Sequence, residues 1–319
     1  MDWIERLEKG NVQFAILLIL LAFYLLTKSV IFAVLTALFI VAAVGIEVYV
    51  GIKKHGVRKE VLETIATVIV ALLLWFGFQR IMNTETPISA IVSCSMLPSL
   101  DRGDLIFVKG IERYNAPILH VTSKDINSLK GLSNVYKGDE YLGSIPGSIM
   151  SYCQATLEGW CVDFANNPSN YKEVKGNFTF QYKKCTRKFL GLHTEKEEPC
   201  LAYLQYGNKK IFFNKSNDVL VYRPTKAELF GMFGDIVHRA FVLLMDEKGN
   251  EYYLTQGDNN NVMDIQFYSY KFNKGNYPIK KSNVLGKVVF RVPYLGYYKL
   301  FLSLYFTEDP LCNTVLIRG

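Results

Sequence analysis

Three apolar segments near the N-terminus constrain most strongly what this chain can fold into. They cover residues 12–27, 30–52 and 61–80. The second and third are long enough to cross a bilayer as helices, which takes ~20 apolar residues. Because a cleavable signal sequence is not usually followed by two further spans, we expect all three segments to be anchors. The sequence therefore predicts an integral membrane protein with three N-terminal transmembrane helices.

The charges between these segments predict how the protein is oriented. The loop 53–60, between the second and third segments, contains four basic residues besides His55. The positive-inside rule places such a loop in the cytoplasm. The third helix then leaves the cytoplasm, so everything from Thr84 onward is expected on the extracytoplasmic face.

The rest of the chain predicts a mainly β domain, because short apolar or alternating segments are separated by glycine-containing turns. Residues 84–110 and 215–296 are expected to form one β domain, with residues 111–214 as a large inserted lobe. The tail 297–319 begins within the aromatic segment 294–306. That segment is too short to span a membrane and favours either an interfacial contact or a core strand.

The lobe contains four cysteines, and cysteines outside the cytoplasm favour disulfides. We expect two bonds, with the pairing open, among Cys153, Cys161, Cys185 and Cys200. A zinc site is less favoured, because no Cys-x2-Cys spacing occurs among them.

A serine turn follows the third apolar segment. Pro98 lacks a backbone N–H, which excludes a helix or strand interior and favours a turn that presents Ser95 before an apolar strand starting at Leu105. A serine there suits a nucleophile, although turns also use serine for backbone hydrogen bonds. The same two interpretations apply to His238, which lies within an apolar strand and is either a general base or a structural histidine.

Two carboxylates are candidates for orienting this histidine. Asp258 begins a polar turn after the strand that is expected to pair with the His238 strand, and Asp264 follows six residues later. A carboxylate beside His238 would fix its tautomer, as in Ser-His-Asp sites. Turn residues of the Gly-Asp-Asn type also hydrogen-bond their own backbone, so the residues alone leave both roles open.

Several ordered motifs resemble the signature boxes of type I signal peptidases, specifically the archaeal and endoplasmic-reticulum branch. The matching segments are Ser93–Pro98 with Arg102–Leu105, Asn217–Tyr222, Ile236–Arg239, Gly257–Asn260 with Asp264, and Gly286 through Gly296. The sequence departs from the family pattern at Cys94 and Asn217, which replace glycines. The lobe has no counterpart in that pattern.

The resemblance implies a role for each matched residue. Ser95 would be the nucleophile and His238 its general base. Asp258 would orient His238 or organise the site, with Asp264 in support, and which of the two is the main carboxylate stays open. Ser93 and Met96 would help to bind the oxyanion or the substrate. No metal or cofactor is expected.

The resemblance further implies a membrane-bound serine endopeptidase that removes signal peptides from exported preproteins. Its site would lie outside the cytoplasm, either at the plasma membrane of an archaeon or in the lumen of the endoplasmic reticulum. Signal peptides, the lipid bilayer and secretion machinery are the expected partners, and nucleic acid is not. Two alternatives stay open: a related peptidase with a narrow substrate set chosen by the lobe, and a catalytically inactive membrane ectodomain.

Overall fold

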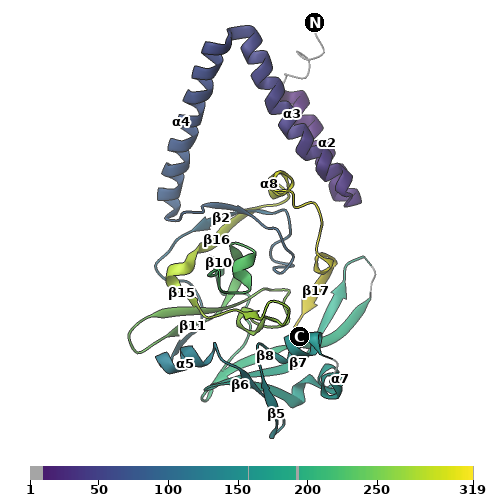
Figure 1. Ribbon diagram of the computed structural model, residues 1–319, viewed down its shortest axis with the longest axis vertical. Helices are drawn as coiled ribbons and strands as arrows, with labels where there is room; N and C mark the ends of the chain where they lie inside the picture. The colour runs from purple at the N-terminus through teal and green to yellow at the C-terminus, as the bar shows by residue number, and fades with distance from the viewer. Residues whose placement is uncertain (1–9, 157, 192–193, 319) are drawn as a thin grey trace. The chain divides into compact units, whose positions relative to one another are not determined.

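The computed structural model describes residues 10–156, 158–191 and 194–318 (Figure 1). It divides into two compact units. The first, the helical unit, contains Met1–Val92, Arg102–Phe107 and Arg291–Glu308, and the second, the β unit, contains Ser93–Asp101, Val108–Phe290 and Asp309–Gly319. Two of the boundaries between the units fall within strands, one in β2 (Leu105–Lys109) and one in β16 (Val284–Val292).

Three apolar helices make up most of the helical unit and are the purple to blue coils of Figure 1. They are α2 (Gly10–Thr27), α3 (Val30–His55) and α4 (Val57–Met82). Within the described residues, α3 and α4 are long and apolar enough to cross a membrane, and the apolar stretch of α2 is shorter. The 26 residues of α4 rise about 39 Å, and none of its described side chains is buried by protein. The structure therefore contains the apolar helices that the predicted membrane anchor requires.

The predicted loop 53–60 is almost entirely helical. Helix α3 continues to His55 and α4 begins at Val57, so that only Gly56 interrupts the helix. Gly56 has a φ of 79°, which lies in the region that glycine adopts at no steric cost. The flanking lysines, arginine and glutamate are good helix formers, which explains why a charged sequence did not become a loop.

The aromatic segment 294–306 contains a helix, α8 (Gly296–Leu302), so the core-strand interpretation is wrong. Within the helical unit, the Tyr24 ring of α2 lies 5.1 Å from the Tyr297 ring and 4.7 Å from the Phe301 ring. The guanidinium of Arg102 donates to the Tyr24 hydroxyl at 2.9 Å. The short strand β1 (Ile88–Ala90) pairs antiparallel with β2 in the same unit.

Among the residues that the structure describes, the β unit contains two large sheets and one two-stranded sheet. The first large sheet carries the residues of the predicted catalytic domain. Its strands follow in the order β16, β10 (Val219–Tyr222), β11 (Ile236–Met245), β12 (Glu251–Gln256) and β15 (Ile279–Lys280). Strand β3 (Ile118–His120) pairs in parallel with β11, although it comes from the segment predicted to be the lobe. A small hairpin joins β13 (Tyr268–Ser269) to β14 (Lys274–Gly275). Residues 238–244 of β11 are buried without alternation, as expected for a strand covered on both faces.

The second sheet is formed by the lobe together with one strand from the C-terminal tail. Its strands follow in the order β5 (Glu140–Ile145), β4 (Ser133–Lys137), β6 (Tyr171–Lys175), β7 (Phe178–Phe189), β8 (Glu195–Tyr206) and β9 (Lys209–Ile211). Strand β17 (Thr314–Ile317) pairs antiparallel with β7. Three short helices accompany this sheet: α5 (Ser123–Ser128), α6 (Ile149–Ala155) and α7 (Gly159–Asn166).

The two large sheets of the β unit share one hydrophobic core. Leu201 and Leu204 of the lobe belong to the same buried cluster as Phe241 and Leu244 of β11. The lobe is thus packed against the first sheet. The predicted fold class, N-terminal apolar helices followed by a largely antiparallel β domain, is confirmed.

Three disulfides close the β unit. The four lobe cysteines pair as Cys153–Cys161 and Cys185–Cys200. The third bond, Cys94–Cys312, links the serine turn to the segment before β17. This bond was not predicted, because its two cysteines are 218 residues apart and no local pattern links them.

Candidate active site

The residues 93–101, here called the nucleophile loop, form a turn whose apolar side chains point into the protein. Cys94, Met96, Leu97 and Leu100 are each at most 5% exposed. Ser95 is only partly buried. The apolar side chains therefore anchor the loop, and the hydroxyl of Ser95 is left near its surface.

A chain of hydrogen bonds runs from Ser95 through His238 to a carboxylate. The Ser95 Oγ lies 2.8 Å from His238 Nε2, and His238 Nδ1 lies 2.7 Å from Asp264 Oδ2. His238 is 4% exposed and Asp264 is 3% exposed, so this chain is shielded from water. With its proton on Nδ1, the imidazole donates to Asp264 and accepts the Ser95 proton at Nε2, which is the arrangement of a serine nucleophile and its base.

Two hydroxyl groups hold Asp264 in place. Its Oδ2 also accepts from the Tyr222 hydroxyl at 2.8 Å and from Thr255 Oγ1. Burial, together with the negative charge of Asp264, raises the pKa of Tyr222 well above its ordinary value. Tyr222 therefore keeps its proton at physiological pH and remains a donor to the carboxylate.

Asp258 does not contact His238, although the family resemblance suggested that it would orient this histidine. Its carboxylate forms two bonds with Arg239, at 2.8 Å from Nε and 2.6 Å from Nη2, and accepts from the Ser99 hydroxyl. Successive residues of a strand point to opposite faces, so His238 and Arg239 of β11 meet different partners. The turn that carries Asp258 reaches the Arg239 side, and Asp264 reaches the His238 side.

The Ser95 backbone is the candidate oxyanion donor. In the parts of the chain that the structure describes, its N–H donates to no protein acceptor. The Ser93 hydroxyl lies 3.2 Å from the Ser95 hydroxyl, on the exposed side of the loop. Met96, the other residue assigned to this role by resemblance, is 1% exposed, so its side chain supports the loop and presents no surface to a substrate.

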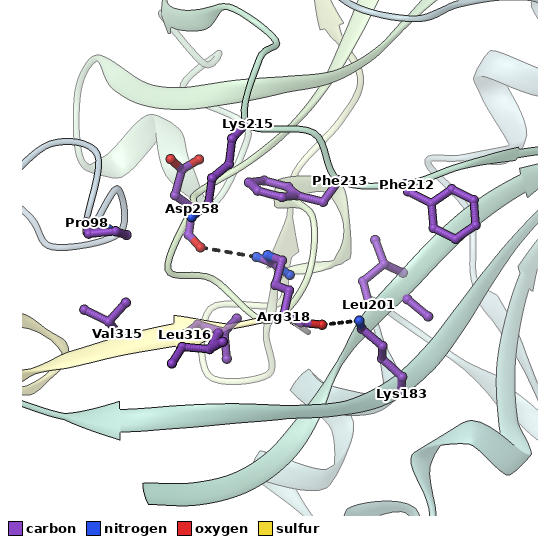
Figure 2. Close-up of a pocket in the computed structure, with 12 residues that line it drawn as sticks. Pro98, Lys183, Leu201, Phe212, Phe213, Lys215, Asp258, Val315, Leu316 and Arg318 are labelled. Atoms are coloured by element: carbon purple, nitrogen blue, oxygen red, sulfur yellow. Dashed lines mark hydrogen bonds between the residues drawn. The ribbon is translucent and has the colours of Figure 1, made fainter. Parts of the chain in front are cut away.

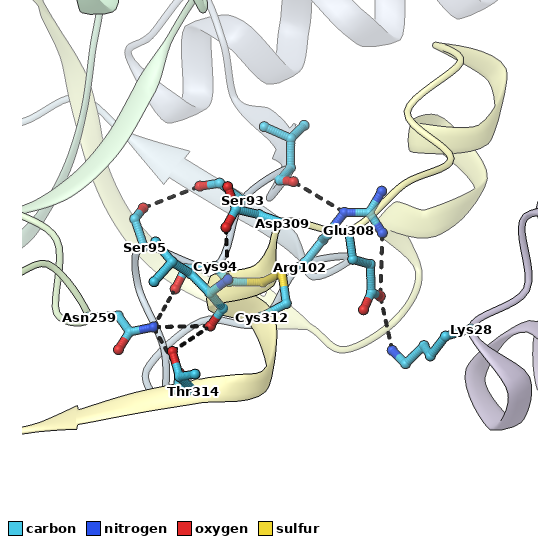
Figure 3. Close-up of a disulfide and its surroundings, with 12 residues drawn as sticks. Lys28, Ser93, Cys94, Ser95, Arg102, Asn259, Glu308, Asp309, Cys312 and Thr314 are labelled. Atoms are coloured by element: carbon cyan, nitrogen blue, oxygen red, sulfur yellow. Dashed lines mark hydrogen bonds and ion pairs between the residues drawn. A yellow bond between two sulfur atoms is a disulfide. The ribbon is translucent and has the colours of Figure 1, made fainter. Parts of the chain in front are cut away.

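Asn259 and Gly257 hold the nucleophile loop from below, and sequence reasoning did not single out either residue. The Asn259 N–H donates to the Ser95 carbonyl at 2.8 Å, and its Nδ2 donates to the Cys94 carbonyl at 3.1 Å (Figure 3). A Cβ at Gly257 would lie 2.6 Å from the Ser95 carbonyl oxygen, so this position requires glycine. The Gly-Asp-Asn-Asn box was recognised in the sequence as a family motif, but a role was assigned only to its Asp258.

A cavity of 590 Å³ borders the nucleophile loop at Pro98 (Figure 2). The cavity is lined by Pro98, Lys183, Leu201, Ala202, Phe212, Phe213, Lys215, Asp258, Val315, Leu316, Ile317 and Arg318. Arg318 donates from Nη2 to the carbonyls of Gly257 and Asp258, both at 3.5 Å, and its burial lowers its pKa to about 10. Neither Ser95 nor His238 lines this cavity, so it adjoins the turn 257–260 without containing the reacting atoms.

Comparison with known proteins gives one consistent result. The chain is 34% identical over 91 residues to the signal peptidase complex catalytic subunit SEC11 of Eremothecium gossypii, and 35% identical over 91 residues to SEC11 of Lachancea thermotolerans and of Saccharomyces cerevisiae. These segments cover 28% of this chain. No family model matches the chain.

The chain spans about half the length of the curated relatives it matches, with shares of 50% and 49% for the first two. The names of these relatives agree with the family predicted from the sequence motifs, since each is called a catalytic subunit of the signal peptidase complex. The comparisons thus confirm that this chain resembles the endoplasmic-reticulum branch of the type I signal peptidases.

Proposed function

We propose that this protein is a membrane-anchored serine endopeptidase that cleaves signal peptides from exported preproteins. The observation that carries the proposal is the hydrogen-bonded series Ser95–His238–Asp264, with separations of 2.8 and 2.7 Å. The SEC11 relatives supply the substrate class. Because the similarity to these relatives covers only part of the chain, the proposed reaction mechanism is argued from the geometry of the site.

The first half of the reaction uses all three side chains. Ser95 Oγ attacks the carbonyl carbon of the scissile peptide bond, and His238 Nε2 takes the Ser95 proton. The carbonyl oxygen becomes negatively charged and is stabilised by the Ser95 N–H and by the Ser93 hydroxyl. His238 then gives its proton to the leaving amine, which leaves an acyl ester on Ser95.

The second half repeats these steps with water. His238 takes a proton from a water molecule, whose oxygen attacks the ester, and then returns that proton to Ser95 Oγ. Asp264 accepts the Nδ1–H bond throughout and stabilises the imidazolium form. Asp258 takes no part in proton transfer in this scheme; it fixes Arg239 and Ser99.

The helices support the membrane part of the proposal. Helices α3 and α4 would cross the bilayer, with the basic residues around Gly56 in the cytoplasm. Ser95 would then face the outside of the cell or the lumen of the endoplasmic reticulum, where the cleavage site of a signal peptide emerges. An extended substrate would bind by adding a strand to the edge of a sheet.

Cleavage of a model preprotein in detergent tests the proposal. We expect the wild type to release the signal peptide, and Ser95→Ala and His238→Ala to lose cleavage while remaining folded. Ser282→Ala and His120→Ala are matched controls, because both residues are exposed and lie outside the site. Full activity in Ser95→Ala would overturn the nucleophile assignment.

The same assay separates the two alternatives. A wild type that cleaves a few of many tested signal peptides would be a peptidase with a narrow substrate set. A wild type that cleaves none, although its thermal unfolding is cooperative, would be a binding ectodomain.

A further inference from the structure

The lobe has no counterpart in the resembled family, yet one of its side chains reaches the turn below the nucleophile loop. Arg187 lies on β7 and is 6% exposed. Its Nη1 donates to Asn259 Oδ1 at 3.0 Å, and its Nη2 donates to the Asn259 carbonyl at 3.2 Å. Arg187 thus binds both the side chain and the backbone of the residue that holds the loop.

The contacts of Arg187 fix which way the Asn259 amide faces. Asn259 Oδ1 accepts from Arg187 and from the Leu316 N–H at 2.8 Å, so its Nδ2 must face the opposite side. There Nδ2 donates to the carbonyls of Cys94 at 3.1 Å and Thr314 at 2.9 Å (Figure 3). Asn259 is fully buried, so water cannot replace either set of partners.

Holding the Cys94 carbonyl determines the direction of the proposed oxyanion donor. The peptide unit between Cys94 and Ser95 is planar, and in a trans peptide the N–H points opposite to the C=O. A hydrogen bond that fixes the Cys94 carbonyl therefore also fixes the direction of the Ser95 N–H. The bond from the Asn259 N–H to the Ser95 carbonyl restrains the next peptide plane in the same way.

We propose that Arg187 of the lobe is a positioning residue, which aims the Ser95 N–H at the oxyanion through Asn259. The proposal rests on the proposed function, and it gives the lobe a role in that reaction. Additional bonds make the guanidinium rigid: Nε donates to Glu198 Oε1 at 2.5 Å, Nη1 to Thr314 Oγ1 at 3.1 Å and Nη2 to Asn261 Oδ1 at 2.7 Å.

The kinetic signature follows from when the oxyanion forms. A bond made only in the transition state changes kcat and leaves substrate binding unaltered. Complete removal of an oxyanion donor costs ~10²–10³ in turnover, and a misdirected donor costs less. We therefore expect Arg187→Gln to lower kcat by about 10- to 100-fold with KM unchanged.

The experiment measures kcat and KM in the full-length chain for Arg187→Gln, Asn259→Ala and the double variant. The two single changes should cost nearly the same, and the double variant should cost no more than the larger one, because both break one pathway. Arg187→Lys, which keeps the charge and some donors, should recover part of the loss. Lys184→Gln is the control, since Lys184 lies on the same strand and pairs with Glu197 on the surface.

A second measurement separates positioning from loss of stability. A peptide aldehyde adds to Ser95 Oγ and places its oxygen at the oxyanion position, so its affinity should fall in parallel with kcat in Arg187→Gln. Binding of an uncleaved substrate, measured in Ser95→Ala and in Ser95→Ala/Arg187→Gln, should be equal. The inference is overturned if Arg187→Gln keeps the kcat of the wild type, or if assay well below its unfolding temperature restores kcat. A wild type without any cleavage would instead remove the proposed function.

Discussion

His238 and Arg239 are adjacent on β11 and bind two different carboxylates. His238 meets Asp264, and Arg239 meets Asp258 in a buried pair with a shortest separation of 2.6 Å. The first pair contains an imidazole, whose two ring nitrogens can donate and accept a proton, and the second contains a guanidinium, which only donates hydrogen bonds. We infer that Asp264 serves the reaction and that Asp258 serves the stability of the loop.

Substituting each carboxylate by its amide separates these roles. We expect Asp264→Asn to lower kcat by ~10³–10⁴, because an amide no longer holds the His238 tautomer or stabilises the imidazolium. Asp258→Asn should instead lower the free energy of unfolding, by about 3–5 kcal/mol, because it leaves Arg239 buried without its charged partner. Preprotein cleavage and thermal unfolding of both variants test this. An active Asp264→Asn beside a stable, inactive Asp258→Asn would reverse the assignment.

The nucleophile loop is an element with little secondary structure of its own, and its neighbours define its shape. The turn 257–260 supports its backbone, and the Cys94–Cys312 disulfide ties it to the segment before β17. Strand β17 in turn pairs with β7 of the lobe. The nucleophile loop is thus connected, through Cys312 and β17, to the lobe.

Removing this disulfide should destabilise the β unit more than removing a lobe disulfide of short span. Cys94→Ala/Cys312→Ala opens a separation of 218 residues, and Cys153→Ala/Cys161→Ala opens one of 8. We expect a loss of about 2–5 kcal/mol for the first pair and less for the second, because the entropy of the unfolded chain grows with the closed loop. Urea unfolding in detergent measures both. Equal losses would show that loop length does not set the stabilisation.

At the scale of the whole molecule, the lobe and the first sheet share one core, and the lobe also contains a buried acid. Glu173 of β6 is fully buried and accepts hydrogen bonds from the Ile149 N–H, from the Tyr182 hydroxyl and from Gln266 Nε2. Burial raises the pKa of Glu173 above its ordinary 4.5. The folded protein therefore binds this proton more tightly than the unfolded chain does.

This raised pKa predicts how stability depends on pH. As pH rises from about 4.5 through the pKa of the folded state, the unfolded chain releases the Glu173 proton first, so this group lowers the free energy of unfolding. Glu173→Gln removes that dependence. The stability of the wild type relative to Glu173→Gln should accordingly fall as pH rises above about 4.5. Glu195→Gln, a change of an exposed acid, is the control. A difference that stays constant or grows with pH would contradict the prediction.

The sequence by itself determined the class of the protein. Apolar length predicts the helices, and alternating short segments predict the β domain, because both depend on local periodicity. The ordered boxes also identified Ser95 and His238 as candidates. The loop predicted at residues 53–60 rested on their charge, whereas the good helix formers there continue the helices on both sides of Gly56.

Only the tertiary structure decided which residues meet. Asp258 and Asp264 are six residues apart, and nothing local says which faces His238; strand pairing and the path of the following turn place Asp264 there. The Cys94–Cys312 bond and the contacts of Arg187 with Asn259 join segments far apart in the chain. Such contacts depend on how sheets pack and on which face a side chain occupies, and a single sequence encodes these only through the complete fold.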